Sequence, residues 1–412
     1  MGSLQVTTDT DHHHDGSGIH LYVEYLQNIR TVSIQASLAT VSNKATKATL
    51  SADGSRLELS HEGETASVQL PIQIPGGHNE ATLNLPAAPT KDLSFRLNVQ
   101  EKPDTDSHLL GTGHNLTKDE NAMPWTAPDL TSQSEICCAR CKAVIVARGA
   151  ITKWKDLPSE SWAEMMEFWH CHKPEVTDGQ AGGDARGIGV NSKLAIERAI
   201  GLVGPLDLIF DAEDCAGVMY KQSHNLQNPP AEDEAICSSC HTAVGVHESA
   251  TDGSIRLRKA RLSISLNPST DHNLYATEKW LTAYILENID SQGIRKFIIS
   301  SRDTPSDLAL NIWVFAPDLT MSSSAFAKGT PTKVVKIVWQ DCEQKPFGPE
   351  KLNTHALFEG DIELPGVELS ELRRLLVVSG EYLPAMGRKF QGWNVGLLRR
   401  FVTEDVQGRS AG

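Results

Sequence analysis

Two short cysteine pairs constrain the fold of this 412-residue chain more than any other feature of its sequence. Cys138 and Cys141 form the first pair, and Cys237 and Cys240 form the second. Two thiols separated by two residues can reach the same cation, and two such pairs supply the four soft ligands of a tetrahedral structural zinc site. The sequence therefore predicts one zinc ion held by all four cysteines, with residues 142–236 folded back between the pairs.

Two other interpretations of these pairs are open. The four cysteines can belong to unrelated buried or exposed pairs, or one pair can be a redox-active dithiol. The redox interpretation is the weaker one, because neither pair opens a helix within a βαβ pattern. Eight cysteines, half of them in these pairs, are more typical of a reducing compartment with bound zinc than of a secreted disulfide framework. We therefore expect the protein in the cytoplasm and the nucleus.

The composition excludes some classes of protein. A formal net charge of −14 argues against a protein that coats nucleic acid, because such a protein needs a basic face to release counterions. No stretch approaches the roughly 18 consecutive apolar residues of a membrane helix, and the first residues lack the basic start and apolar run of a secretory signal. We expect protein partners, without direct binding to nucleic acid or membranes.

The N-terminal part of the chain has the two-residue period of β-strands. Residues 1–18 are polar and predict a flexible tail. Strand-like runs follow at 19–25, 32–36, 48–50, 56–59, 66–74, 81–85 and 93–99. Short strands separated by turn residues predict an antiparallel sheet or sandwich over residues 19–100. Residues 101–135 have little periodicity and are expected to be a connector.

Residues 136–260 are predicted to form a zinc-binding β domain with a glycine-rich insertion. Apolar residues at helical spacing predict a short amphipathic helix that Pro174 ends, just after the sequence His170, Cys171 and His172. The glycines between 177 and 190 match no nucleotide-binding loop and predict an ordinary loop.

Residues 261–412 are predicted to form a C-terminal α+β domain. A helix is also predicted at 193–201, within the zinc-binding domain. In the C-terminal domain, helices are predicted at 277–290 and 370–379, and strands at 261–266, 295–300, 308–315 and 333–339. Near the end, Trp393, Val395 and Leu397 alternate with strand period, which favours an internal strand over a docking segment for a partner. The predicted fold class is a β-rich α+β protein with an N-terminal antiparallel sheet, a zinc-pinned β middle and a C-terminal α+β portion.

Several short motifs, taken in order, resemble a known family. They occur at 138–141, 157–162, 169–172, 236–240, 312–315 and 337–342. Together they resemble the HECT-like ubiquitin ligases that bind ubiquitin-conjugating enzymes, and the likeness covers residues 120–401. The resemblance implies ubiquitin-ligase activity and a ubiquitin-conjugating enzyme as partner. In fungal and animal relatives it also implies a link to the endonuclease of pre-mRNA 3′-end processing.

The position of a catalytic cysteine is less clear from the residues themselves. A HECT ligase carries ubiquitin as a thioester on an exposed, activated cysteine near the end of its domain. The last cysteine here, Cys342, has an apolar strand-like context that favours a buried, inert thiol. Cys171 is then the candidate nucleophile, because the flanking His170 and His172 can stabilise a thiolate, although the C-terminal end of a helix opposes this.

Cys171 has two other interpretations. It can be a packing residue, or it can bind a second zinc ion with His172 and either Cys215 or His224.

The sequence leaves two functions open. The first is a ubiquitin ligase that works with a ubiquitin-conjugating enzyme, in the regulation of pre-mRNA 3′-end processing. The second is a non-catalytic, zinc-containing protein that binds and stabilises the processing endonuclease. The second gains support because neither the terminal HECT cysteine nor the eight zinc ligands of a RING domain are present.

Overall fold

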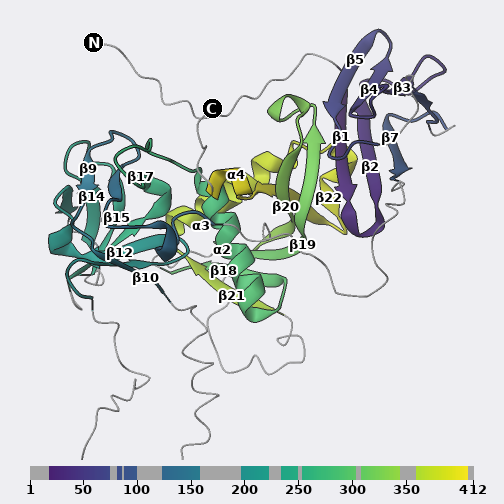
Figure 1. Ribbon diagram of the computed structural model, residues 1–412. Helices are drawn as coiled ribbons and strands as arrows, with labels where there is room; N and C mark the ends of the chain where they lie inside the picture. The colour runs from purple at the N-terminus through teal and green to yellow at the C-terminus, as the bar shows by residue number, and fades with distance from the viewer. Residues whose placement is uncertain are drawn as a thin grey trace, which may run out of the picture. The chain divides into compact units, whose positions relative to one another are not determined.

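The computed structural model describes residues 18–74, 81–85, 88–99, 123–157, 196–221, 233–248, 253–302, 308–343 and 359–406. Four sheets dominate these residues (Figure 1), which confirms the predicted β-rich α+β fold. Internal contacts divide the chain into two compact units. The first combines Met1–Ala122, Leu281–Ile289 and Gly293–Thr403, and the second combines Met123–Trp280, Asp290–Gln292 and Glu404–Gly412. In the described part, no helix is long and apolar enough to cross a membrane.

The N-terminal strands form two sheets that share one core. In the first, β1 (Ile19–Leu26), β2 (Thr31–Leu38) and β7 (Asp92–Asn98) pair antiparallel in that order. The second has the order β5-β4-β3-β6, built from β3 (Lys47–Leu50), β4 (Arg56–His61), β5 (Glu64–Gln69) and β6 (Ala81–Leu83). Alternate apolar residues of both sheets pack together, as their two-residue period predicts. The predicted N-terminal antiparallel sheet is confirmed.

Strand β1 is buried on both faces. Leu21 and Val23 belong to the N-terminal core, whereas Tyr22 packs in a second core with Leu319 and Met321. A strand that is apolar on both faces needs cover on both. The second cover becomes available because β1 pairs with the C-terminal end of β19 (Leu308–Ser323). One nine-stranded sheet thus contains strands that were predicted to lie in separate N-terminal and C-terminal domains.

Strand β19 changes partner along its length. Its N-terminal part pairs with β18 (Lys296–Ser301), its C-terminal part pairs with β1, and β20 (Thr332–Glu343) runs along its other edge. The register with β20 shifts twice, on either side of Ala316. Pro317 lies at this irregularity and has no N–H to donate to a ladder. β19 therefore pairs with both β18 and β1 along one edge, on either side of the irregularity.

The C-terminal residues form an internal strand. β23 (Trp393–Arg399) pairs with β20 on one side and with β22 (Lys389–Phe390) on the other. Helix α3 (Gly366–Gly380) packs closely on β23 at Gly396, where an added Cβ would lie 2.8 Å from Leu376 Cδ2. Three apolar residues of this strand are buried, namely Val395, Leu397 and Leu398. The predicted internal strand is confirmed.

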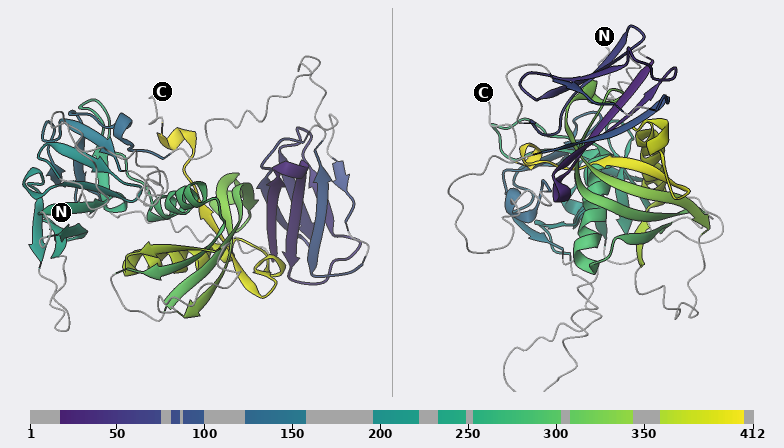
Figure 2. Two further views of the ribbon diagram at one scale, coloured as in Figure 1. Left: turned by 90° about the horizontal axis from the view of Figure 1, so that it is seen from below. Right: turned by 90° about the vertical axis from the view of Figure 1, so that its right-hand side faces the viewer.

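The second unit contains two sheets, coloured teal in Figures 1 and 2. The larger has the order β10-β11-β12-β16-β15-β14-β13 and is parallel only between β10 and β11. Its strands are β10 (Lys153–Asp156), β11 (Ile200–Val203), β12 (Asp207–Asp211), β13 (Val218–Lys221), β14 (Asp233–Cys237), β15 (Ala243–Glu248) and β16 (Ser254–Arg258). The smaller has the order β17-β8-β9, built from β8 (Glu135–Cys138), β9 (Val144–Val146) and β17 (Leu262–Ser265).

One local prediction is wrong in this unit. Residues 196–201 run through a turn into β11, so the described part of the predicted helix over 193–201 is not helical. Ala199 has a left-handed φ of 59°, which a helix interior does not allow. The expected helix over 277–290 is present as α2 (Thr277–Gln292), and Trp280 near its start packs on Trp125 with ring centroids 5.1 Å apart.

Candidate metal centre

The two cysteine pairs lie in turns that have the same local structure. The first turn joins β8 to β9, and the second joins β14 to β15. Lys142 N donates to Cys138 O, and His241 N donates to Cys237 O, both at 2.9 Å. Lys142 and His241 also share a left-handed conformation, with φ of 63° and 54°. Each turn therefore presents the two thiols of its pair in the same way.

The two turns bring four sulfur atoms into one cluster. Cys138 Sγ lies 3.7 Å from Cys240 Sγ, and Cys141 Sγ lies 3.6 Å from Cys237 Sγ. All four atoms lie within 4.8 Å of one another. A tetrahedral ion with metal–sulfur bonds of about 2.3 Å separates its sulfur ligands by about 3.8 Å. The cluster thus has the donor type, number and spacing to bind one divalent cation such as zinc.

The protonation of these thiols depends on their surroundings. Burial raises the pKa of Cys138 to about 12. Burial also acts to raise the pKa of Cys240, but hydrogen bonds with Thr242 and with the neighbouring thiols outweigh it and lower this pKa to about 6. The lowered pKa of Cys240 favours its thiolate form, whereas the raised pKa of Cys138 favours its thiol form. A divalent cation would displace the remaining protons, because the thiolate is the metal ligand.

Contacts between the two turns hold the pairs in place. Ser238 N donates to Gly217 O at 3.0 Å, and the Arg140 guanidinium donates to Thr242 Oγ1 at 3.2 Å. Gly217 passes so close to β9 that an added Cβ would lie 2.0 Å from Val144 O. Only glycine allows this approach. Backbone contacts of Gly217 with both β9 and Ser238 therefore help to fix the separation of the two turns.

Comparison with known proteins places the whole chain in a family. A family described as HECT-like Ubiquitin-conjugating enzyme (E2)-binding matches residues 24–395. The chain belongs to this HECT-like E2-binding family. The match spans both compact units, so the family likeness extends to the fold as a whole and not only to the cysteine turns. This confirms the resemblance that the short motifs indicated.

Two fungal members are similar over much of their length. An uncharacterized protein of Schizosaccharomyces pombe is 25% identical over 338 residues, which cover 78% of this chain and 90% of that protein. An uncharacterized protein of Saccharomyces cerevisiae is 24% identical over 249 residues, which cover 56% of this chain and 65% of that protein. No solved structure matches the chain.

Several predicted site residues of this HECT-like protein fall outside the described residues. They are Cys171 with its neighbours His170 and His172, and His224. The candidate nucleophile and the second zinc site built on Cys171 therefore stay predictions.

Cys215 and Cys342 are two of the described cysteines that lie outside the four-sulfur cluster. Cys215 is buried, and its pKa is raised by burial first and then by Asp214 and Asp211. Both effects oppose a nucleophilic role, which requires an accessible thiol with a lowered pKa. Cys342 lies on β20 as its apolar context predicted, but it is only partly buried.

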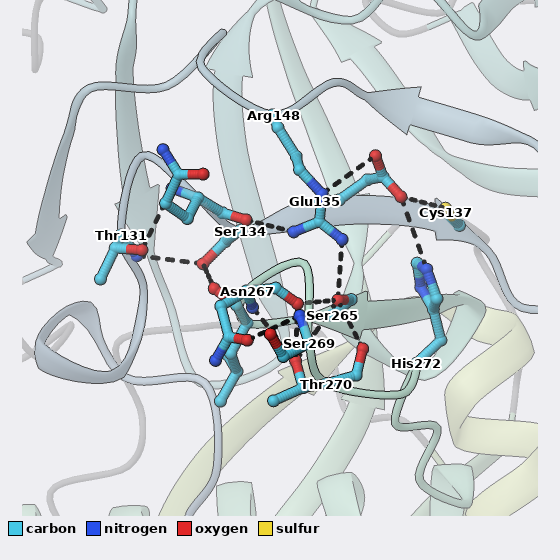
Figure 3. A network of polar contacts seen from close by, with 12 residues as sticks. Thr131, Ser134, Glu135, Cys137, Arg148, Ser265, Asn267, Ser269, Thr270 and His272 are labelled. Atoms are coloured by element: carbon cyan, nitrogen blue, oxygen red, sulfur yellow. Dashed lines mark hydrogen bonds and ion pairs between the residues drawn. The ribbon is translucent and has the colours of Figure 1, made fainter.

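A second group of metal-ligand side chains, which no sequence motif indicated, lies in the same unit. Glu135, Cys137 and His272 place one ligand atom each within 4.8 Å of one another, as Figure 3 shows. Burial and the Glu135 carboxylate raise the pKa of Cys137 to about 11. Alternation puts Glu135 and Cys137 on one face of β8, a signal present in the sequence. His272, in contrast, is far from both residues in the sequence, so no short motif connects it with them.

Proposed function

We propose that the protein binds a ubiquitin-conjugating enzyme and works with it as a ubiquitin-protein ligase. The single observation that carries this proposal is the E2-binding family match over residues 24–395. Because that match needs both compact units, recognition of the enzyme would use the folded chain and not one short motif. The acidic net charge of −14 is compatible with a protein partner and unfavourable for nucleic acid.

The four-cysteine cluster has a structural role in this proposal. Zinc would be held by Cys138, Cys141, Cys237 and Cys240, as the sulfur separations of 3.6 and 3.7 Å support. Four protein ligands leave no open position on the ion for substrate or water, which is the arrangement of structural and not catalytic zinc. The ion would clamp the β8–β9 and β14–β15 turns together.

The exposure of the cysteines limits which of them could carry ubiquitin. Among the described thiols outside the cluster, Cys137 and Cys215 are buried and Cys342 is partly buried. A thioester with a protein as large as ubiquitin needs an accessible sulfur. The carrier would therefore be Cys171, or ubiquitin would pass directly from the conjugating enzyme to its target.

The same thiol environments favour a second candidate function. Without a reactive thiol the protein would act as a non-catalytic binding protein that stabilises the endonuclease of pre-mRNA 3′-end processing. For this role, as for the ligase role in the same process, we propose that the protein acts in the cytoplasm and the nucleus.

A discharge assay tests the ligase proposal. Ubiquitin-conjugating enzymes charged with ubiquitin are mixed with the purified full-length protein, and loss of the enzyme thioester is followed with and without free lysine. We expect at least one conjugating enzyme to be captured and its discharge to be faster than with the enzyme alone. Capture without faster discharge would favour the stabilising function, and no capture of any conjugating enzyme would refute E2 binding.

A further inference from the structure

The face of the small sheet β17-β8-β9 next to the first cysteine turn carries polar side chains in an unusual arrangement. Glu135 and Cys137 alternate on β8, and β17 places Ser265 opposite Glu135 and Ser263 opposite Cys137. Directly paired residues of antiparallel strands lie on the same face. His272 comes from the loop after β17 and reaches the same place (Figure 3). This face therefore gathers a carboxylate, a thiol, an imidazole and two hydroxyl groups.

The separations among three of these groups fit one metal ion. Glu135 Oε2 lies 3.5 Å from His272 Nε2 and 3.9 Å from Cys137 Sγ. Bonds of about 2.0 Å to oxygen and nitrogen and about 2.3 Å to sulfur would place the oxygen about 3.3 Å from the nitrogen and about 3.5 Å from the sulfur around a tetrahedral ion. The observed distances exceed these values by a few tenths of an ångström, which small side-chain rotations can close.

Neighbouring residues orient the Glu135 carboxylate and hold the backbone beside His272. Arg148 Nε lies 3.5 Å from Glu135 Oε1, the oxygen that faces away from His272, and the Arg148 guanidinium also donates to Ser265 Oγ at 2.9 Å. The loop before His272 is tied to β17, because Ile264 and Asn273 exchange backbone hydrogen bonds of 3.0 and 2.9 Å. Outer contacts of this kind are what position the ligands of metal sites.

Ser263 gives an independent indication that the cluster lacks a component. Its side chain is fully buried on the face that carries Cys137, and among the described residues its Oγ has no hydrogen-bond partner. A buried hydroxyl without a partner costs on the order of 1–3 kcal/mol. A water molecule on an ion held by the three ligands would supply that partner.

The burial of Cys137 favours a metal-binding role over a nucleophilic role for this cysteine. Cys137 is 2% exposed, so a protein-bound acyl group cannot approach its sulfur, whereas a small ion can enter beside the partly exposed Glu135 and His272. We propose that Glu135, Cys137 and His272 form a second metal site that takes a borderline divalent cation, zinc in particular, and leaves its fourth position open to water. Three mixed ligands and an open position distinguish it from the closed four-cysteine site.

Metal counting on the full-length protein tests this proposal. All samples carry His12, His13 and His14→Ala, because these consecutive histidines can chelate metal themselves. After dialysis against Zn²⁺, we expect two ions per chain. His272→Ala and Glu135→Gln should each leave one ion at the same free Zn²⁺, with affinity for the second ion reduced more than about 10-fold. Cys342→Ser, a cysteine of the first unit that belongs to neither cluster, should keep both.

Cobalt reports on the ligands directly. In Co²⁺-loaded protein, the spectrum lost on His272→Ala should have the sulfur-to-metal absorption of one thiolate, while the four-thiolate absorption persists. Near-UV circular dichroism establishes that each variant is folded, and Glu135→Gln keeps the shape of the side chain if His272→Ala does not fold. One ion per chain in the starting protein would overturn the proposal, as would a second ion that survives both substitutions in folded protein.

Discussion

Cys138 and Cys240 lie in turns that are distant in the sequence, yet their sulfur atoms are 3.7 Å apart. Burial raises the pKa of Cys138 to about 12, while hydrogen bonds with Thr242 and with the neighbouring thiols lower that of Cys240 to about 6. A bound cation would take all four sulfur atoms as thiolate ligands. At the scale of single residues, the stability of the second unit should therefore depend on these sulfur atoms.

Cys138→Ser and Cys240→Ser should each lose about one zinc ion per chain and lower the melting temperature of the second unit by on the order of 10 °C. The reason is that the free energy of binding structural zinc is part of the free energy of folding. Metal analysis and calorimetry on the same samples provide the measurement. Cys342→Ser is the matched control, because this cysteine belongs to the first unit and should change neither quantity. Unchanged metal content in Cys138→Ser would contradict the prediction.

The ion pair of Asp341 with Arg373 gives a residue-scale prediction with a defined pH dependence. Arg373 donates to both carboxylate oxygens at 2.7 Å, and its hydrogen bonds hold the pKa of Asp341 below the usual value. The stabilisation is therefore present above the unfolded-state pKa of about 3.9 and is lost as pH falls through the lower folded-state pKa.

Asp341→Asn should cost only about 0.5 kcal/mol at pH 7, because both side chains are more than 40% exposed. The difference between the two proteins should shrink as pH falls below 4. Urea denaturation of both proteins across this range measures it. A constant difference at every pH would mean that the substitution acts through packing and not through the charge.

At the scale of elements, the two-residue period located the N-terminal strands because alternate residues of each strand pack in the shared N-terminal core. The same period could not reveal that β1 pairs with β19, since pairing partners are set by tertiary packing and not by local pattern. The prediction of a helix over 193–201 is wrong in its described part for a similar reason. Its composition suits a helix, but the pairing of β11 with both β10 and β12 outweighs that weak preference.

Deletion from Gly392 onward tests the place of β23 in the first unit. The deletion removes the ladder with β20 and the buried Val395, Leu397 and Leu398. We expect a loss of at least about 3 kcal/mol, from burial of about 1.5 kcal/mol or more per side chain. Equilibrium unfolding measures the loss, and deletion from Gly408 onward is the matched control because it keeps β23 intact. A loss of stability within about 0.5 kcal/mol would contradict this prediction and favour a segment that docks on a partner.

At the scale of the whole molecule, the four-cysteine cluster was predictable and the Glu135 cluster was not. Short Cys-x-x-Cys spacings indicate a metal site regardless of the fold, because both ligands of each pair come from one turn. His272, in contrast, joins Glu135 and Cys137 only through the pairing of β17 with β8. A site assembled from separate strands by single residues leaves no spacing signal in the sequence.

The proposed ligase activity leads to a comparison of two thiols. Cys171→Ser should abolish ubiquitin transfer if Cys171 is the carrier, with zinc content and melting temperature unchanged, because only the nucleophile is lost. Cys342→Ser should keep full activity. Both variants are assayed for a ubiquitin adduct that a thiol reductant removes, after incubation with activating and conjugating enzymes. Full transfer by Cys171→Ser would show that no thioester on Cys171 is required.

The pairing of Tyr22 with Ser323 across the first unit also determines when this protein can fold during its synthesis. At about 5–20 residues per second, a ribosome needs on the order of 15–60 s to make the chain between these two positions. Through that interval β1 can pair with β2, but it lacks β19 on its other edge and the residues that cover its second apolar face. The nascent chain must therefore be kept from aggregating until β19 leaves the ribosome. The burden on cellular chaperones should be correspondingly greater for this protein than for one that folds domain by domain from its N-terminus.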